Sequence, residues 1–307
     1  AYLSTFDLKT INIQASGELE NWGFSEISDL LSLNSEEIRN ERHKFFNIKG
    51  TTANDYKETL FKVAADKNVL AGIRHLGGNV EIPFIHINPD FVIESIEQIR
   101  AIKTLIYPAF EKFKPLYIDL WINPSNPLFD ELLDISKPHL MYVVGDIKDI
   151  LTDNAAKSLP SNMRLEKVKD ESFYQWYKEI YDQFHLSNPE LKDWEPLNDK
   201  EDMLVAKESE LLWYVMNGNE KIGMIQASRE SLFSRPALYM SEVLLTEDYR
   251  GKGLAPLVQL AAIKESAANN ELVWGTIDYK NQASYKTALN VGRKNIRSGF
   301  MLPIANL

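Results

Sequence analysis

The chain has 307 residues, of which 44% are hydrophobic and 25% charged, and it contains no cysteine. These proportions exclude a disordered, collagen-like or coiled-coil chain, and the lack of cysteine excludes disulfides, thiolate metal sites and a cysteine nucleophile. Lys and Arg number 34 against 44 Asp and Glu, a net charge of −10, so nothing in the overall charge favours nucleic acid or an anionic membrane as a partner.

The start of the chain shows no signal peptide, and no apolar stretch is long enough to span a bilayer. We therefore expect a soluble, cytoplasmic protein without a membrane partner; the oligomeric state is left open. The histidines are scattered, none shows metal-ligand spacing on a helix, and no HExxH or serine-centred motif occurs, so we expect no metal. They are His43, His75, His86, His139 and His185.

The first half of the chain changes repeatedly between strand-like and helix-like patterns. Alternating apolar residues predict strands, and apolar residues spaced by three and four positions predict helices. In chain order the patterns predict a strand at 10–15, helices at 25–33 and 36–46, strands at 59–65, 69–76 and 81–87, a helix at 93–113, a strand at 116–122, a helix at 127–135 and a strand at 140–144.

The second half repeats this order of elements. The patterns predict a strand at 162–169, helices at 171–184 and 199–207, strands at 211–216, 221–228 and 238–245, a helix at 253–268, a strand at 271–278, a helix at 282–290 and a strand at 297–304. The match over so many elements favours a tandem duplication over a chance resemblance. We expect two domains, 1–150 and 151–307, with a hinge in the polar stretch 145–161. The predicted fold class is α/β (α+β mixed sheet), each domain a mixed, mostly antiparallel sheet flanked by helices.

The segment that is most informative about function is Ser241–Ala255, in which a hydrophobic strand leads into a basic, glycine-containing loop and then a helix. A helix N-terminus carries unpaired backbone N–H groups and partial positive charge. Gly251 and Gly253 permit a positive φ and close backbone approach to a ligand, while Arg250 and Lys252 add full charges. Together these features predict a site for a diphosphate-sized anion.

This loop reads RGKGLA over Arg250–Ala255 and resembles the Arg/Gln-x-x-Gly-x-Gly/Ala motif of the GCN5-related N-acetyltransferase (GNAT) superfamily. The acidic-aromatic lead-in Glu247–Tyr249 and the Asn281 that follows the next strand fit the same family pattern. The resemblance covers residues 162–307 directly. The first half shares only the order of elements and lacks the motif, so we interpret it as a degenerate copy that has lost cofactor binding.

The resemblance implies that the protein uses acetyl-CoA and acylates an amine by direct attack. The loop amides would hold the pyrophosphate, and the strand ending at Leu245 would diverge from its neighbour so that the pantetheine arm pairs with its open edge. A bulge near 242–245 would aim a backbone N–H at the thioester oxygen. Asn281 matches the family's cofactor-contacting Asn, although it could be only a helix N-cap. The implied acyl-CoA contacts are Val243, Leu244, Leu245, Arg250, Gly251, Lys252, Gly253, Leu254, Ala255, Asn281 and Ser284.

The implied reaction needs two proton transfers, and each suggests a candidate catalytic residue. An attacking amine must lose a proton, and Glu242 lies in the strand where related enzymes often place an acidic residue facing the acceptor, so burial there would raise its pKa. The family's proton donor to the departing thiolate is often a Tyr, but that position is Ala288 here. Tyr285 is the candidate substitute, with Tyr279 or a water molecule as the alternatives.

The acceptor is left open among small-molecule, amino-acid and peptide amines. An acidic cleft formed by Asp193, Glu195 and Glu242 would suit a cationic amine, and Trp194 could contact it. The rival hypothesis, which rests on Ala288 and the degenerate first half, is a non-catalytic acyl-CoA-binding or interaction module.

Overall fold

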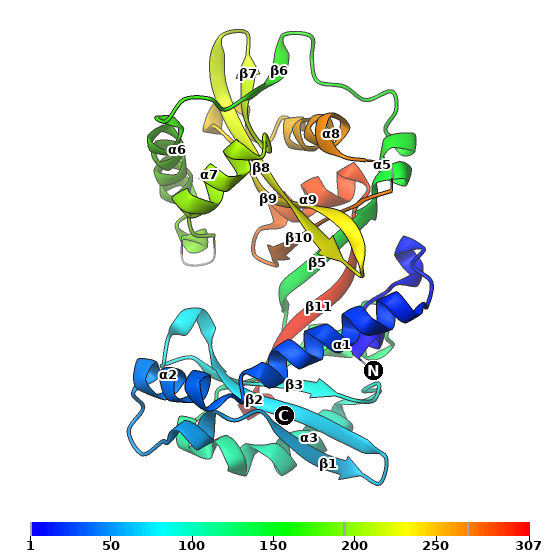
Figure 1. The fold of residues 1–307 in the computed structure, drawn as a ribbon, viewed down its shortest axis with the longest axis vertical. Coiled ribbons are helices and arrows are strands. Elements are labelled where there is room, and N and C mark those ends of the chain that lie inside the picture. Colours follow the sequence, from blue (N-terminus) through cyan, green and yellow to red (C-terminus); the bar gives the residue numbers. More distant parts are fainter. Residues whose placement is uncertain (1, 193–194, 269) are drawn as a thin grey trace. The chain divides into compact units, whose positions relative to one another are not determined.

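The computed structural model describes residues 2–192, 195–268 and 270–307. The chain forms two compact units, one made of Ala1–Met141 with Ile296–Leu307 and the other of Tyr142–Asn295 (Figure 1). The sequence division at residue 150 therefore differs from the compact units at two places. Residues 142–150 lie in the second unit, and residues 296–307 return to the first.

The first unit has a mixed sheet in the order β1-β2-β3-β4-β11. Its strands are β1 (Thr59–Ala64), β2 (Lys67–His75), β3 (Pro83–Pro89), β4 (Tyr117–Ile122) and β11 (Lys294–Pro303), and its helices are α1 (Gly17–Ser32), α2 (Glu36–Phe46), α3 (Ile96–Phe110) and α4 (Leu128–Ile135). The apolar sides of α3 and α4 pack against β2, β3, β4 and β11 in one core. β3 and β4 run parallel, while the other pairs with a described register in this unit are antiparallel.

The second unit has a sheet in the order β5-β10-β9-β8-β7-β6. Its elements are β5 (Pro138–Asp146), α5 (Ile147–Asp153), β6 (Met163–Lys167), α6 (Phe173–Ser187), α7 (Lys200–Glu208), β7 (Leu212–Asn217), β8 (Glu220–Leu232), β9 (Arg235–Leu245), α8 (Leu254–Ser266), β10 (Leu272–Asp278) and α9 (Gln282–Val291). The mixed sheet flanked by helices confirms the predicted fold class. None of the helices in the described ranges is long and apolar enough to cross a membrane.

Most predicted elements are present, and three differ. The strand predicted at 10–15 is wrong: a short 3-10 turn, Lys9–Ile11, stands there, because the Asp7 carboxylate bonds both the backbone N–H and the hydroxyl of Thr10. α1 begins at Gly17 rather than residue 25, since Ser16 caps it. Part of the expected hinge is helical, since α5 is capped by the Asp146 side chain and buries two isoleucines.

The sheet of the second unit separates two apolar layers. One layer packs the sheet against α8 and includes Leu238, Met240 and Leu245 of β9. The other packs the opposite face against α6 and α7 and includes Leu244. Figure 1 shows α6 and α7 on one side of the strands and α8 on the other. The face that a β9 side chain occupies therefore decides which helices it meets.

Two of the histidines that look scattered in the sequence meet in the first unit. The carboxylate of Asp119, which is 4% exposed, contacts His86 Nδ1 at 2.7 Å and His139 Nε2 at 3.1 Å. These hydrogen bonds lower the pKa of Asp119 against the opposing effect of burial. Within the described ranges no group of three or more His, Cys, Asp or Glu is arranged to hold a metal ion. We interpret the trio as a structural cross-link within the first unit, between β3, β4 and the segment 138–141, which belongs to that unit.

Asp119→Asn is expected to lower the free energy of unfolding by about 2–4 kcal/mol, because it leaves a buried hydrogen-bonding network with one partner changed. Urea denaturation followed by tryptophan fluorescence measures the change. The matched control is Asp66→Asn, an exposed turn position, which should change stability by less than about 0.5 kcal/mol. Equal denaturation midpoints for the two variants would contradict the structural role of the trio.

Candidate active site

β9 and β10 are paired over only part of their length. Their parallel ladder runs from Leu272↔Ala237 to Trp274↔Tyr239, whereas β9 continues to Leu245 and β10 to Asp278. We call the last pair, Tyr239 and Trp274, the strand fork. Beyond it, β9 pairs with β8 on one side, and no described strand pairs with it on the other. The divergence expected from the sequence is thus present, with an edge to which an extended ligand could bind.

A β-bulge lies directly after the fork. Gln226 of β8 pairs with Glu242 while Ala227 pairs with Met240, so Ser241 is an extra residue in β9. The bulge reverses the alternation of side chains. Met240, before it, packs toward α8, whereas Leu244, after it, packs toward α6 and α7. Glu242 consequently faces α6, which an uninterrupted strand would not allow.

Glu242 has two hydrogen-bond donors and a raised pKa. Its Oε2 accepts the Tyr177 hydroxyl at 2.7 Å, and its Oε1 accepts the Val243 backbone N–H at 2.9 Å. Burial outweighs these bonds and, together with the charge of Glu195, raises the pKa of Glu242 to about 7. A carboxyl group that titrates near neutral pH can both take up and release a proton under working conditions.

A second carboxylate lies within electrostatic range of the first. Burial raises the pKa of Glu195, and a hydrogen bond from Asn281 partly offsets that rise. Burial and the charges of Glu242 and Glu195 raise the pKa of Tyr181, so its hydroxyl stays protonated. Two members of the expected acidic cleft are therefore neighbours. The other residues named for it, Asp193 and Trp194, lie outside the described residues.

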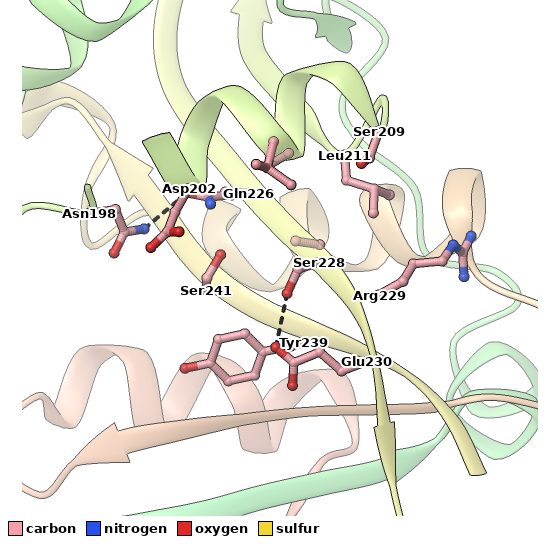
Figure 2. A pocket seen from close by; sticks show the side chains of 13 residues that line it. Asn198, Asp202, Ser209, Leu211, Gln226, Ser228, Arg229, Glu230, Tyr239 and Ser241 are labelled. Carbon is pink, nitrogen blue, oxygen red and sulfur yellow. Dashed lines mark hydrogen bonds between the residues drawn. The ribbon is translucent and has the colours of Figure 1, made fainter. Parts of the chain in front are cut away.

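A pocket opens beside the bulge on the α7 side of the sheet (Figure 2). It measures about 770 Å³, and Asn198, Gln226, Tyr239 and Ser241 form part of its wall. The Asn198 side chain donates to Gln226 Oε1 at 3.0 Å, and the Asn198 backbone N–H donates to the Tyr177 hydroxyl at 3.1 Å. The pocket wall is thus connected by hydrogen bonds to Tyr177, the residue that donates to Glu242.

The loop after β9 has the backbone geometry of an anion site. Gly251 and Gly253 have φ of 70° and 72°, values that side-chain-bearing residues rarely adopt. Gly253 is the N-cap of α8, and no side chain caps that helix end. Residues 251–253 are exposed. The first-turn amides of α8 therefore meet solvent directly and can bind an oxyanion.

Arg250 mainly fixes the loop in place. Its Nε donates to the Leu245 carbonyl at 2.7 Å, and its guanidinium carbon lies 4.8 Å from the centre of the Phe184 ring. Burial lowers the pKa of Arg250. Its Nη2 is buried without a partner and remains available to a ligand. The Lys252 ammonium lies over the Tyr249 ring, 5.5 Å from its centre.

The start of α9 shows where the other expected residues lie. Asn281 caps the helix by accepting the Ser284 backbone N–H at 3.0 Å, so its cap role is present together with its bond to Glu195. Tyr285 is half-buried and hydrogen-bonded to Asn295, and burial raises its pKa. Ala288 is fully buried beside Val143 and Ile277, which leaves no hydroxyl at that position.

Sequence reasoning missed part of this site. Tyr177 and Tyr181 lie in the helix predicted at 171–184, for which no functional residue was predicted, yet hydroxyls four residues apart on a buried helix face signal polar partners in the core. Asn198, Gln226 and Ser241 carry no local signal. Gln226 and Ser241 become neighbours through the register of β8 with β9, and a hydrogen bond joins Asn198 to Gln226.

The family comparison agrees with this geometry. The model of the acetyltransferase (GNAT) family matches residues 171–292, a range that holds the fork, the bulge, the loop and α9. Residues 171–292 thus match the GNAT acetyltransferase family, in agreement with the resemblance noted at Arg250–Ala255. No curated protein matches the chain significantly.

Solved structures also align with much of the chain at low sequence identity. A GCN5-related N-acetyltransferase from Sphaerobacter thermophilus is 11% identical with a TM-score of 0.47, covering 83% of this chain and 82% of its own. A GNAT-family acetyltransferase from Colwellia psychrerythraea is 12% identical with a TM-score of 0.45, covering 76% and 81%. A tandem GNAT protein from the clavulanic acid biosynthesis pathway is 10% identical with a TM-score of 0.41, covering 87% and 95%.

Tyr177→Phe is expected to raise the pKa of Glu242 above 7, by about one pH unit, because the lost hydroxyl stabilises the charged carboxylate. A ¹³C NMR titration of glutamate-labelled protein measures the shift without any turnover. Tyr174→Phe is the control, since that hydroxyl on the same helix donates to a backbone carbonyl, Asn198 O. An unchanged Glu242 midpoint in Tyr177→Phe would show that the hydrogen bond does not control the titration.

Proposed function

We propose that the chain transfers an acetyl group from acetyl-CoA directly to the amine of a small molecule, amino acid or peptide. The observation that carries the proposal is Glu242, a carboxyl group with a pKa of about 7 that the bulge places next to an open strand edge. A protonated amine needs such a base before it can attack a thioester. The absence of cysteine leaves no route through a cysteinyl intermediate.

The residues along β9 and α8 fit an acyl-CoA donor. The uncapped start of α8, the positive-φ glycines and the unpartnered Arg250 Nη2 suit a diphosphate. The open edge of β9 over Val243–Leu245 suits an extended amide-containing arm. When bound, the donor would supply the thioester carbonyl. We propose as its contacts Val243, Leu244, Leu245, Arg250, Gly251, Lys252, Gly253, Leu254, Ala255, Asn281 and Ser284.

Glu242 is the proposed general base. It would accept the proton of the acceptor amine, and the Tyr177 hydroxyl would hold the carboxylate in one orientation through its bond of 2.7 Å. Tyr285 is the proposed proton donor to the leaving group, because it carries a hydroxyl on α9 three residues before Ala288; its pKa is raised by burial, so the hydroxyl is protonated before transfer. The pocket beside Ser241 is the proposed acceptor site.

We also propose that residues 1–150 and 151–307 descend from one duplicated fold. In each half an antiparallel strand trio leads through a helix to a strand parallel to the last member of the trio, as β3 with β4 and β9 with β10. The helix that follows β3 is α3, which corresponds in this comparison to α8 after β9. Its N-cap is Ser95, and Glu97 lies in its first turn. Such an acidic, side-chain-capped helix start repels a diphosphate, so the first half would have lost donor binding.

Gly253→Glu is expected to weaken acetyl-CoA binding at least ten-fold, since it places a negative side chain and a strained φ at the uncapped end of α8. Isothermal titration calorimetry with acetyl-CoA measures the affinity. Gly218→Glu is the control, because Gly218 has a φ of 57° but lies at the β7–β8 turn. Failure of the unmutated protein to bind acetyl-CoA would overturn the proposed function.

Glu242→Gln is expected to lower kcat by about 10²–10⁴-fold, the usual contribution of a general base. In the unmutated enzyme the rate should rise with pH through about 7 as Glu242 ionises and then level. In the variant the rate should instead follow the free-amine fraction and keep rising. A screen of amine acceptors for CoA release provides the assay. Identical pH profiles for the two proteins would remove Glu242 from the mechanism.

A further inference from the structure

Arg293 is a buried arginine that none of the roles described so far explains. It follows Gly292, the left-handed C-cap of α9, and is 4% exposed. Its backbone N–H donates to the Ala288 carbonyl at 3.1 Å. A Cβ on Gly145 of β5 would lie 3.4 Å from the Arg293 Cα. The backbone at Arg293 is therefore held tightly by its surroundings.

Two nitrogens of the Arg293 guanidinium group, Nε and Nη1, are buried without a hydrogen-bond acceptor among the described residues. None of the ion pairs found among those residues involves Arg293. Burial lowers the pKa of Arg293 to about 10, so the group remains charged at neutral pH. An unpaired buried charge costs several kcal/mol, and an anionic ligand would recover that cost.

The charge lies at the strand fork. Arg293 Nη1 is 3.2 Å from the point that a Cβ on Gly275 would occupy, and the Met240 carbonyl oxygen is also 3.2 Å from that point. Gly275 and Met240 are the first residues beyond the last β9–β10 pair. Any side chain at Gly275 would crowd the guanidinium, so the glycine leaves room for it at the point where the strands part.

Two other buried donors without partners lie at the same stretch of the two strands. They are the Ser241 hydroxyl in the bulge and the Trp274 indole N–H in the last pair. Ser241 also lines the proposed acceptor pocket. Unpartnered donors are rare in protein interiors. Ser241 adjoins Met240 and Trp274 adjoins Gly275 in sequence, at the place where the strands part, so a ligand with oxygen acceptors bound at the fork would have further donors close by along the chain.

We propose that Arg293 binds a carboxylate carried by one of the two reactants, either the far end of a dicarboxylic acyl chain or the carboxylate of an amino-acid acceptor. This inference rests on the proposed function and narrows its substrate class. A planar guanidinium pairs with a carboxylate through two parallel hydrogen bonds. The donor diphosphate cannot be this anion, because the strand from Met240 to Leu245 already separates the fork from the loop by roughly 16 Å.

The test compares acids with matched neutral partners, in binding and in turnover. Calorimetry and initial rates are measured for succinyl-CoA against acetyl-CoA, and for amino acids against their amides. We expect the unmutated protein to prefer the acid in one of the two pairs. Arg293→Met should lower affinity and kcat/KM for that acid about 100-fold or more, and change the values for its neutral partner less than three-fold. The pair that responds identifies whether donor or acceptor carries the carboxylate.

Two further variants make the result specific. Arg293→Lys keeps the positive charge but not the planar guanidinium group, so it should retain only part of the preference for the acid. This variant also provides the test if Arg293→Met does not fold. Arg164→Met, an exposed arginine paired with Glu166, should leave the preference unchanged. Equal treatment of acid and neutral partners by the unmutated protein, or a preference that survives in both Arg293 variants, overturns the inference. Binding of acetyl-CoA with no acid preference leaves the proposed function standing, whereas no CoA binding overturns that as well.

Discussion

One extra residue in β9 determines the chemistry that this fold can perform. If β9 ran regularly through Ser241 with no bulge, Glu242 would continue the alternation of Leu238 and Met240 and face the apolar layer under α8. A carboxyl group there would meet only hydrophobic side chains. The bulge turns it instead toward Tyr177 and the pocket wall, and the same local disruption occurs where β9 leaves β10.

In the proposed function, the fork would let β9 serve two ligands at once. Its open edge leads in one direction to the exposed amides of the loop, where an anion is favoured by the uncapped helix. In the other direction it leads to the pocket beside Ser241 and to the buried charge of Arg293. The helix start and Arg293 are two positive sites separated along one strand. Each would hold an anionic group of a reactant, so that the reactive ends meet near Glu242.

Local sequence patterns predicted the elements and the anion loop because helix starts, glycines and apolar periodicity are short-range properties. The loop residues Gly251 and Gly253 adopt the positive φ that their pattern suggested. The active-site network could not be predicted in this way. Gln226 lies opposite Glu242, and Tyr177 donates to Glu242, only because of a strand register that one inserted residue shifts. The return of β11 to the first unit likewise depends on long-range pairing that carries no local signal.

The electrostatics of the site favour the approach of a cation. After burial, the charge of Glu195 raises the pKa of Glu242, and the charge of Asp278 raises that of Glu195, because negative charges in a partly buried space repel. An ammonium group entering beside them would reverse this effect, stabilise the ionised carboxylate and lower the pKa of Glu242. The base would thus become ionised as the acceptor arrives. Transfer of the amine proton to Glu242 would then remove both charges together, which is favourable in a site that burial has largely withdrawn from water.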